Sequence, residues 1–252
     1  MTSLALTTDT ALLSALIFAA AVLYASVGHA GASGYIAAMA LMGTAPAVMK
    51  PTALVLNILV ATLGTLRWHR MGLVNWKALL PLLIGSIPCA FIGGAMNLPA
   101  SWYRALIGVL LLVAATKLLF QPRESTTATD KAAEVPLGGG LISGGTVGML
   151  SGLTGTGGGI FLSPVMLFLG WAGPRQVSGL TIPFILCNSI AGLAGNVIVL
   201  QSLPSELPLL AAAALTGAFV GTQIGIRWAS GVLLQRLLGI VLVVAGLKFL
   251  WV

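Results

Sequence analysis

Residues 155–159 read Gly-Thr-Gly-Gly-Gly, and residues 28–32 read Gly-His-Ala-Gly-Ala. Each cluster interrupts an apolar stretch that is otherwise long enough to form a membrane helix. Adjacent glycines are poor helix formers, and lipid cannot hydrogen-bond a bare amide, so non-helical chain at membrane depth needs protein or a wet cavity beside it. The two clusters therefore predict a helical membrane protein whose helices are broken at ligand-binding points.

The composition supports a membrane location. Of the 252 residues, 58% are hydrophobic and only 7% are charged, whereas soluble domains have about 25% charged residues. Charge-free runs at 78–103, 176–205 and 207–226 reach the length of about 20 residues that a helix needs to cross a bilayer. The fold class predicted is an all-α polytopic membrane protein.

Several function classes are disfavoured by what the sequence does not contain. The net charge of +7 comes from basic residues scattered at helix ends, a pattern that fits membrane topology better than nucleic-acid binding. Cys89 and Cys187 lie inside apolar runs, and no CxxC, HExxH, GxSxG or Walker-type motif is present. We therefore expect no disulfide, metal, cofactor or ATP hydrolysis, and no enzyme.

Glycine, proline and charged residues divide the chain into helical segments and two halves. The predicted segments are 11–27, 33–45, 51–67, 78–97, 102–120, 137–153, 160–171, 176–200, 206–227 and 231–251. The one hydrophilic stretch, 121–136, is a linker between a first transmembrane repeat (1–120) and a second (137–252).

The two halves share a spacing that indicates internal duplication. Three glycine pairs are each separated by 127 positions (155 minus 28, 158 minus 31, 170 minus 43): Gly28 and Gly155, Gly31 and Gly158, Gly43 and Gly170. Pro46 matches Pro174 after one inserted residue, and Asn57 corresponds loosely to Asn188. Several matches on one diagonal exceed what a single GxxG would give by chance.

Two topologies compete for these halves. If each glycine-broken segment crosses once, the halves are parallel with eight spans, and Lys and Arg divide seven against five between the two faces. If 11–45 and 137–171 are hairpins that return to the same face, the halves are inverted, and the division is nine against three. The positive-inside rule favours inverted halves with both termini outside. The parallel arrangement remains open.

The glycine clusters are also the candidate substrate site. A cluster that opens a helix leaves unpaired amides at the positive end of the helix dipole, where an anion can bind without a countercharge. Side chains of Thr156, His29 and Ser33 would add donors, and the two asparagines would close the cavity. The predicted substrate-binding residues are Gly28, His29, Gly31, Ser33, Asn57, Gly155, Thr156, Gly157, Gly158, Gly159 and Asn188.

Other interpretations of these residues stay in view. Glycines in membrane helices are often small-xxx-small packing positions, and a buried histidine is often neutral and bonded to a carbonyl. Lys50 and Arg175 follow the two short arms, where they either attract anions at the entrances or anchor helix ends. No Asp or Glu lies in a predicted span, so carboxylate-based sodium sites and proton relays have no evident members.

The combination of motifs resembles one known family over nearly the whole chain. The duplicated glycine motif ends in turns at Gly43 and Gly170, and residues 52–64 lead into a basic loop at 67–77. This pattern is similar to the TauE/SafE sulfite exporters, also called the toluene sulfonate uptake permease family. Family motif positions carry over to Gly28, Gly31, Gly155, Gly157, Gly158 and Gly159. The first copy departs from the motif at Ala30 and Ala32.

The resemblance implies secondary transport, commonly outward, of small sulfur-containing anions such as sulfite, sulfoacetate or other organosulfonates. We expect a multi-pass protein of the bacterial cytoplasmic membrane that works by alternating access, with a small anion and the lipid bilayer as partners. A coupling proton or sodium ion and a homodimer are left open. An uncoupled anion channel is the nearest alternative, followed by a membrane-embedded enzyme or an assembly subunit.

Overall fold

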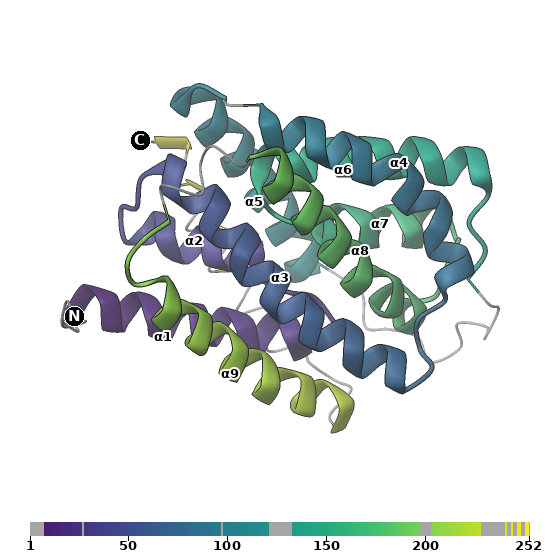
Figure 1. The fold of residues 1–252 in the computed structure, drawn as a ribbon, viewed down its shortest axis with the longest axis horizontal. Helices are drawn as coiled ribbons and strands as arrows, with labels where there is room; N and C mark the ends of the chain where they lie inside the picture. The colour runs from purple at the N-terminus through teal and green to yellow at the C-terminus, as the bar shows by residue number, and fades with distance from the viewer. Residues whose placement is uncertain are drawn as a thin grey trace.

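The computed structural model describes residues 8–26, 28–96, 98–120, 133–196 and 203–227, and single helical positions between 240 and 251. The elements in these ranges are all helices (Figure 1). They are α1 (Thr8–Ser26), α2 (Ala32–Leu41), α3 (Pro46–Arg70), α4 (Trp76–Ala95), α5 (Ala100–Phe120), α6 (Leu137–Thr154), α7 (Gly159–Phe168), α8 (Pro174–Gly195) and α9 (Leu207–Arg227). Five of them, α1, α3, α4, α8 and α9, are long and apolar enough to cross a membrane.

The all-helical prediction is confirmed, and the predicted segments differ from these helices mainly at their ends. α3 starts at Pro46 rather than at 51, because a proline at the first helical position lacks only an N–H that would have no partner there. α8 ends at Gly195 rather than at 200. The predicted linker residues 121–132 and most of the predicted segment 231–251 lie outside the described residues.

α1 and α2 form a hairpin around the first glycine loop, which we define as residues 28–31. α1 ends at Ser26, and Gly28, two residues further on, has a φ of 76°, the left-handed conformation that follows many helices. The next amide, of His29, donates back to the Tyr24 carbonyl at 2.9 Å. α2 then returns along α1, since the Tyr24 and Ser33 hydroxyls are 2.5 Å apart.

α6 and α7 form a second hairpin around the second glycine loop, which we define as residues 155–158. The end of this hairpin comes back to its beginning, because the Glu134 amide donates to the Trp171 carbonyl at 3.0 Å. The indole of Trp171 also lies against Gly139 in the first turn of α6. α7 therefore turns back and does not continue in the direction of α6.

The two hairpins have matching backbone geometry. α2 and α7 begin 127 positions apart (159 minus 32) and end 127 positions apart (168 minus 41). The three glycine pairs at the same spacing all have positive φ: 76° and 77° at Gly28 and Gly155, 108° and 80° at Gly31 and Gly158, and 76° and 66° at Gly43 and Gly170. The spacing seen in the sequence thus corresponds to turns of the same hand.

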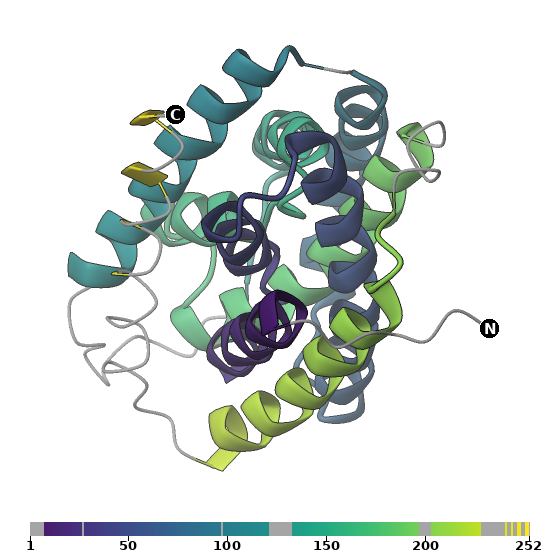
Figure 2. The same ribbon diagram turned by 90° about the vertical axis from the view of Figure 1, so that its left-hand side faces the viewer.

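The hairpins are held by helices from the opposite half. α4 packs against α6, and α9 packs against α1, as both views show (Figures 1 and 2). Three α6 glycines face the α4 backbone in the same order along the chain: Gly144 faces Leu82, Gly148 faces Ser86 and Gly152 faces Ala90. The two helices are therefore parallel, and these glycines are the close-packing positions that membrane helices commonly use.

α3 and α8 cross at the centre of the molecule and are antiparallel. Gly64 lies against Ile182, the Asn57 amide donates to the Ser189 hydroxyl at 3.3 Å, and Gly192 lies near Leu54. Residue numbers thus rise along one helix as they fall along the other. Similarly, α5 is antiparallel to the C-terminal helical residues, since Gly108 faces Leu250 and Gly246 faces Leu112.

Candidate functional site

Both short helices begin at the α3–α8 crossing, and Asn57 of α3 joins their starts. Its Oδ1 accepts from the amide of Ala32, the first residue of α2, at 3.0 Å. Its Nδ2 donates to the carbonyl of Thr156 in the second glycine loop at 3.3 Å. Asn57 is 0% exposed. One buried amide, halfway along α3, therefore connects the start of α2 to the second glycine loop.

The second glycine loop is closely fitted to this crossing. A Cβ added at Gly157, whose φ is 74°, would collide with the Asn57 amide and with Ile185. A Cβ at Gly158, with φ of 80°, would lie 3.0 Å from the Phe184 ring. Gly159 faces Ile185 as well. The loop is not continuous helix, and its glycines are required both by backbone conformation and by close approach.

The start of α7 offers backbone donors. Gly158 occupies the N-cap position and supplies no side-chain cap. The first amides of a helix have no acceptor within the helix, so they need partners from elsewhere. The hydroxyls of Thr154 and Thr156 are 2.9 Å apart, and Tyr103 donates to the Thr154 carbonyl at 3.1 Å. These contacts fix the loop's entry, and Gly157 and Gly159 at the start of α7 lie against the crossing.

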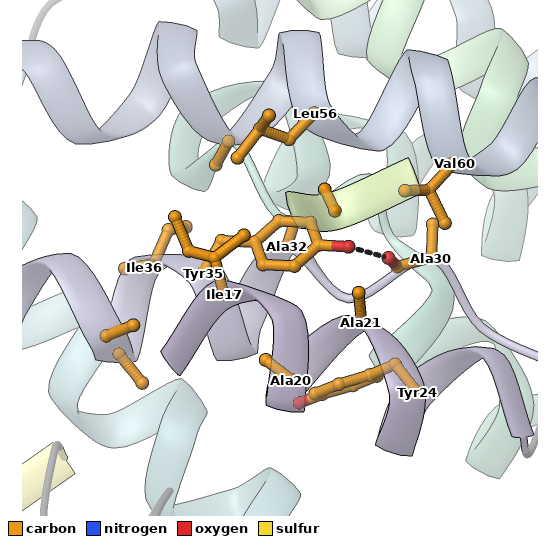
Figure 3. Packing of buried hydrophobic residues seen from close by; sticks show 14 of the residues in the cluster. Ile17, Ala20, Ala21, Tyr24, Ala30, Ala32, Tyr35, Ile36, Leu56 and Val60 are labelled. Atoms are coloured by element: carbon orange, nitrogen blue, oxygen red, sulfur yellow. Dashed lines mark hydrogen bonds between the residues drawn. The ribbon is translucent and has the colours of Figure 1, made fainter. Parts of the chain in front are cut away.

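Two tyrosines of its own hairpin contact the first glycine loop. Gly31, at the N-cap of α2, has φ of 108° and faces the Tyr35 ring. The Tyr35 hydroxyl donates to the Ala30 carbonyl at 2.6 Å, and the Tyr24 side chain lies beside it on α1 (Figure 3). Ser33 bonds to the Tyr24 hydroxyl. Two buried tyrosines therefore hydrogen-bond to the Ala30 carbonyl and the Ser33 hydroxyl beside this loop.

His29 connects the first loop to the second hairpin. Its Nε2 is 2.9 Å from the Ser163 hydroxyl on α7. Ser163 also donates to the Gly159 carbonyl at 3.0 Å and lies 3.2 Å from the Thr181 hydroxyl. The imidazole thus belongs to a chain of hydroxyls that ends at the first residue of α7.

Gly28 and Gly155 each pack against the start of a helix from the other half. Gly28 lies against Ser178 of α8 and Trp68, whereas Gly155 lies against Lys50 of α3. Lys50 is only 7% exposed, and its ammonium donates to the carbonyls of Gly93, Gly94 and Met96 at 3.3, 3.0 and 3.3 Å. Of the two interpretations of Lys50, an entrance residue that attracts anions or an anchor of a helix end, these contacts fit the second, because Lys50 caps the carboxyl end of α4. The side chain of Arg175 is not among those described.

Asn188 lies elsewhere than the loose correspondence with Asn57 suggested. The spacing of 128 between Pro46 and Pro174 (174 minus 46) places Ile185, not Asn188, at the position equivalent to Asn57. The Asn188 amide donates to the Ser86 hydroxyl at 3.1 Å and to the Phe184 carbonyl at 2.8 Å. Its Oδ1 is buried without a hydrogen-bond partner in the described part of the chain. Asn188 therefore contacts α4 instead of bridging the loops.

Four buried hydroxyl residues around the second loop were not singled out from the sequence: Ser151, Ser163, Thr181 and Ser189. A signal for two of them was present. Ser151 precedes Gly155 by four residues, and Ser163 follows Gly159 by four, so each lies on the helix face that carries the adjoining glycine. Thr181 and Ser189 lie one helical turn before and after Ile185 on α8. Only the three-dimensional structure shows that this part of α8 contacts the second glycine loop.

The electrostatics of the crossing favour an anion. In the described helices α1 to α9, the only acidic residue is Asp9, in the first turn of α1. The amino-terminal ends of α2 and α7 meet at the crossing, and each carries the positive end of a helix dipole. Amides and hydroxyls at such a place bind phosphate-like or sulfate-like oxygens well.

Long apolar helices, two glycine-broken hairpins and a central crossing define a multi-pass membrane protein of the broken-helix type. The chain belongs to the sulfite exporter TauE/SafE family, whose model matches residues 13–249, and the family predicted from the motifs is confirmed. It is similar to the probable membrane transporter protein y4hK of Sinorhizobium fredii, with 40% identity over 235 residues that cover 93% of this chain and 95% of that protein. No solved structure matches the chain.

Proposed function

We propose that this membrane transporter is a secondary exporter of small sulfur-containing anions, such as sulfite, sulfoacetate or other organosulfonates, and that it works by alternating access. The family's description names sulfite export, and the Sinorhizobium protein is described as a probable membrane transporter. The observation that carries the proposal is the meeting of two helix starts at Asn57. Of the acidic residues that the structure describes, Asp9, Glu134 and Glu206, none lies in α2, α3, α7 or α8.

The anion would lie at the α3–α8 crossing against the glycine loops. Backbone amides coordinate its oxygens, and glycine allows the approach because no Cβ stands between amide and ligand. The side chains that complete the site are His29, Ser33, Asn57, Thr156 and Asn188. Asn188 would contribute through Nδ2, because its unpartnered Oδ1 is an acceptor and cannot donate to an anion.

Alternating access follows if the two halves are inverted. Corresponding helices of inverted halves are antiparallel, and α3 and α8, which both follow a short helix, have that relation. The exchange of contacts is reciprocal as well: α4 holds α6 as α9 holds α1. The two hairpins would then enter from opposite faces of a bacterial cytoplasmic membrane, with both termini outside. Rocking of one half against the other opens the site to each face in turn.

The first test measures transport in proteoliposomes. Gly158→Val should abolish sulfite and sulfonate flux, because a branched side chain cannot adopt φ near 80° and would fill the site beside the α7 amides. Gly138→Val is the matched control, since a Cβ at Gly138, in the same hairpin, meets nothing within 4 Å. Preserved flux in Gly158→Val, with normal membrane insertion, would contradict the proposal.

The same vesicles separate a carrier from an uncoupled anion channel. A secondary transporter should accumulate labelled sulfite above the outside concentration when a proton or sodium gradient is imposed. A channel carries the anion only until its own electrochemical gradient disappears. Failure of every imposed ion gradient to drive accumulation would favour the channel.

A further inference from the structure

We infer that the two glycine loops are functionally unequal: the oxyanion binds at the start of α7, where the Ser151 hydroxyl donates to it, and the start of α2 takes no substrate. This inference rests on the proposed function and restricts it to one loop. Three independent differences between the loops support it.

The first difference is an unpartnered hydroxyl. Ser151 is 0% exposed, and its Oγ has no hydrogen-bond partner within the ranges that the structure describes. On the same helix, Thr146 and Thr154 donate to the carbonyls four residues back, at 2.9 and 2.7 Å. Ser151 could use the Val147 carbonyl in the same way and does not. Its own helix therefore does not satisfy this hydroxyl.

Ser151 lies beside the start of α7. The Cβ of Ser151 is 3.2 Å from the place where a Cβ on Gly158 would be, and Gly158 is the N-cap of α7. A buried hydroxyl without a partner is costly, and a ligand oxygen accepting from it removes that cost. Since the neighbouring backbone groups are also donors, the complementary ligand is an oxyanion.

The second difference concerns the position equivalent to Ser151 in the first half. Tyr24 precedes Ser151 by 127 residues (151 minus 24). Its hydroxyl bonds to Ser33 in the first turn of α2, and the first α2 amide is already bonded to Asn57. At the start of α2, the Tyr24 hydroxyl and Asn57 Oδ1 thus bond to the Ser33 hydroxyl and the Ala32 amide, which would otherwise be donors to an anion.

The third difference is charge. Gly155 packs against Lys50, whereas Gly28 packs against Ser178, which follows Lys50 by 128 positions (178 minus 50). The contact at the second loop is thus made by a lysine, whose ammonium lies at the carboxyl end of α4. The equivalent contact at the first loop is made by a serine, which carries no charge. An anion is stabilised more at the second loop.

The test compares two hydroxyl deletions at equivalent positions, Ser151→Ala and Tyr24→Phe. Both proteins are purified, their thermal midpoints are measured without ligand, and their affinities for sulfite, methanesulfonate, phosphate and acetate are determined by calorimetry. Ser151→Ala should keep or raise the midpoint and weaken sulfite and methanesulfonate binding about tenfold, as expected for loss of a hydrogen bond to a charged group. Tyr24→Phe should lower the midpoint and change each affinity less than about twofold, because no ligand contact is lost.

The outcomes separate the inference from the proposed function. Wild-type affinity in Ser151→Ala, or an equal loss in Tyr24→Phe, overturns the inference and leaves sulfur-anion transport standing. Binding of phosphate alone, weakened in Ser151→Ala, overturns the sulfur-anion substrate and upholds the site. A wild-type protein that binds none of the four anions overturns both.

Discussion

The two glycine loops have the same backbone turns and different surroundings. Gly31 and Gly158 occupy the same N-cap position, yet one faces a tyrosine ring and the other faces Ser151 and Phe184. Around the first loop, Tyr35 bonds to the Ala30 carbonyl, Asn57 to the Ala32 amide and Ser163 to His29. Beside the second loop, a buried hydroxyl has no partner in the described part of the chain. A turn that requires glycine therefore does not by itself mark a ligand site. Whether such a turn binds a ligand depends on which polar groups around it lack partners in the protein.

The comparison extends to the glycine content itself. The positive-φ residues of the first loop are Gly28 and Gly31, and those of the second include Gly157. Ala30 stands in the first loop at the position equivalent to Gly157. The family motif can therefore lose a glycine where the backbone does not need one, and the departure at Ala30 has a local structural cause.

The largest effect is expected at the residue that both loops share. Asn57→Leu should destabilise the protein by about 4 kcal/mol, because it leaves the Ala32 amide, the Thr156 carbonyl and the Ser189 hydroxyl buried without their partner. Thermal unfolding of the purified protein measures this. The control is Ile185→Val at the equivalent position, with an expected cost of about 1 kcal/mol. Equal costs for the two variants would refute the bridging role of Asn57.

The next effect distinguishes the loops directly. Gly157→Ala should cost about 3 kcal/mol, because its φ of 74° disfavours any residue with a Cβ and the added methyl meets the Asn57 amide. Ala30→Gly, at the equivalent position, should cost less than about 1 kcal/mol. Denaturant unfolding and sulfite flux should rank the two variants in the same order. The reverse order would contradict the asymmetry.

A smaller effect is expected from the buried cation. Lys50→Met removes three hydrogen bonds to the α4 carbonyls but also removes a charge that is costly to bury, so the net loss should be about 1–2 kcal/mol. Sulfite affinity should fall as well, because the second loop loses its nearby positive charge. Ser178→Ala should leave affinity unchanged. Unaltered affinity in Lys50→Met would show that the lysine serves α4 alone.

The smallest effect concerns the first loop. Tyr35→Phe deletes one hydrogen bond, to the Ala30 carbonyl, and should reduce the stability of the protein by about 1 kcal/mol. Transport at saturating sulfite should stay within about twofold of wild type, because this hydroxyl completes the loop and does not face substrate. A transport defect larger than the stability loss explains would indicate that the first loop also handles the anion.

Much of the architecture could be predicted from the sequence because its signals are local. Glycine and proline end helices by restricting or freeing backbone dihedrals, so the short arms after each cluster were placed close to α2 and α7. The spacing of 127 positions likewise pairs glycines that all have positive φ. The family could be predicted for the same reason, since its motif is the pair of turns.

The site could be predicted only in part, because its contacts join residues far apart in the chain. Asn57 was chosen for being polar in an apolar run, but nothing local shows that its partners lie in both loops. Lys50 looked like a helix-end anchor, and its burial depends on where α4 ends. Ser151 looked like one more small residue among glycines. Ser151 matters because no acceptor in the described part of the chain bonds to its buried hydroxyl, and the sequence does not show this.

The most direct test of an anion held by the second loop is to locate a heavier analogue of the substrate. Crystals of the protein soaked in selenite should give one anomalous selenium peak at the start of α7, within hydrogen-bond distance of its first amides and of Ser151. A peak at the start of α2, or equal peaks at both helix starts, would contradict the account.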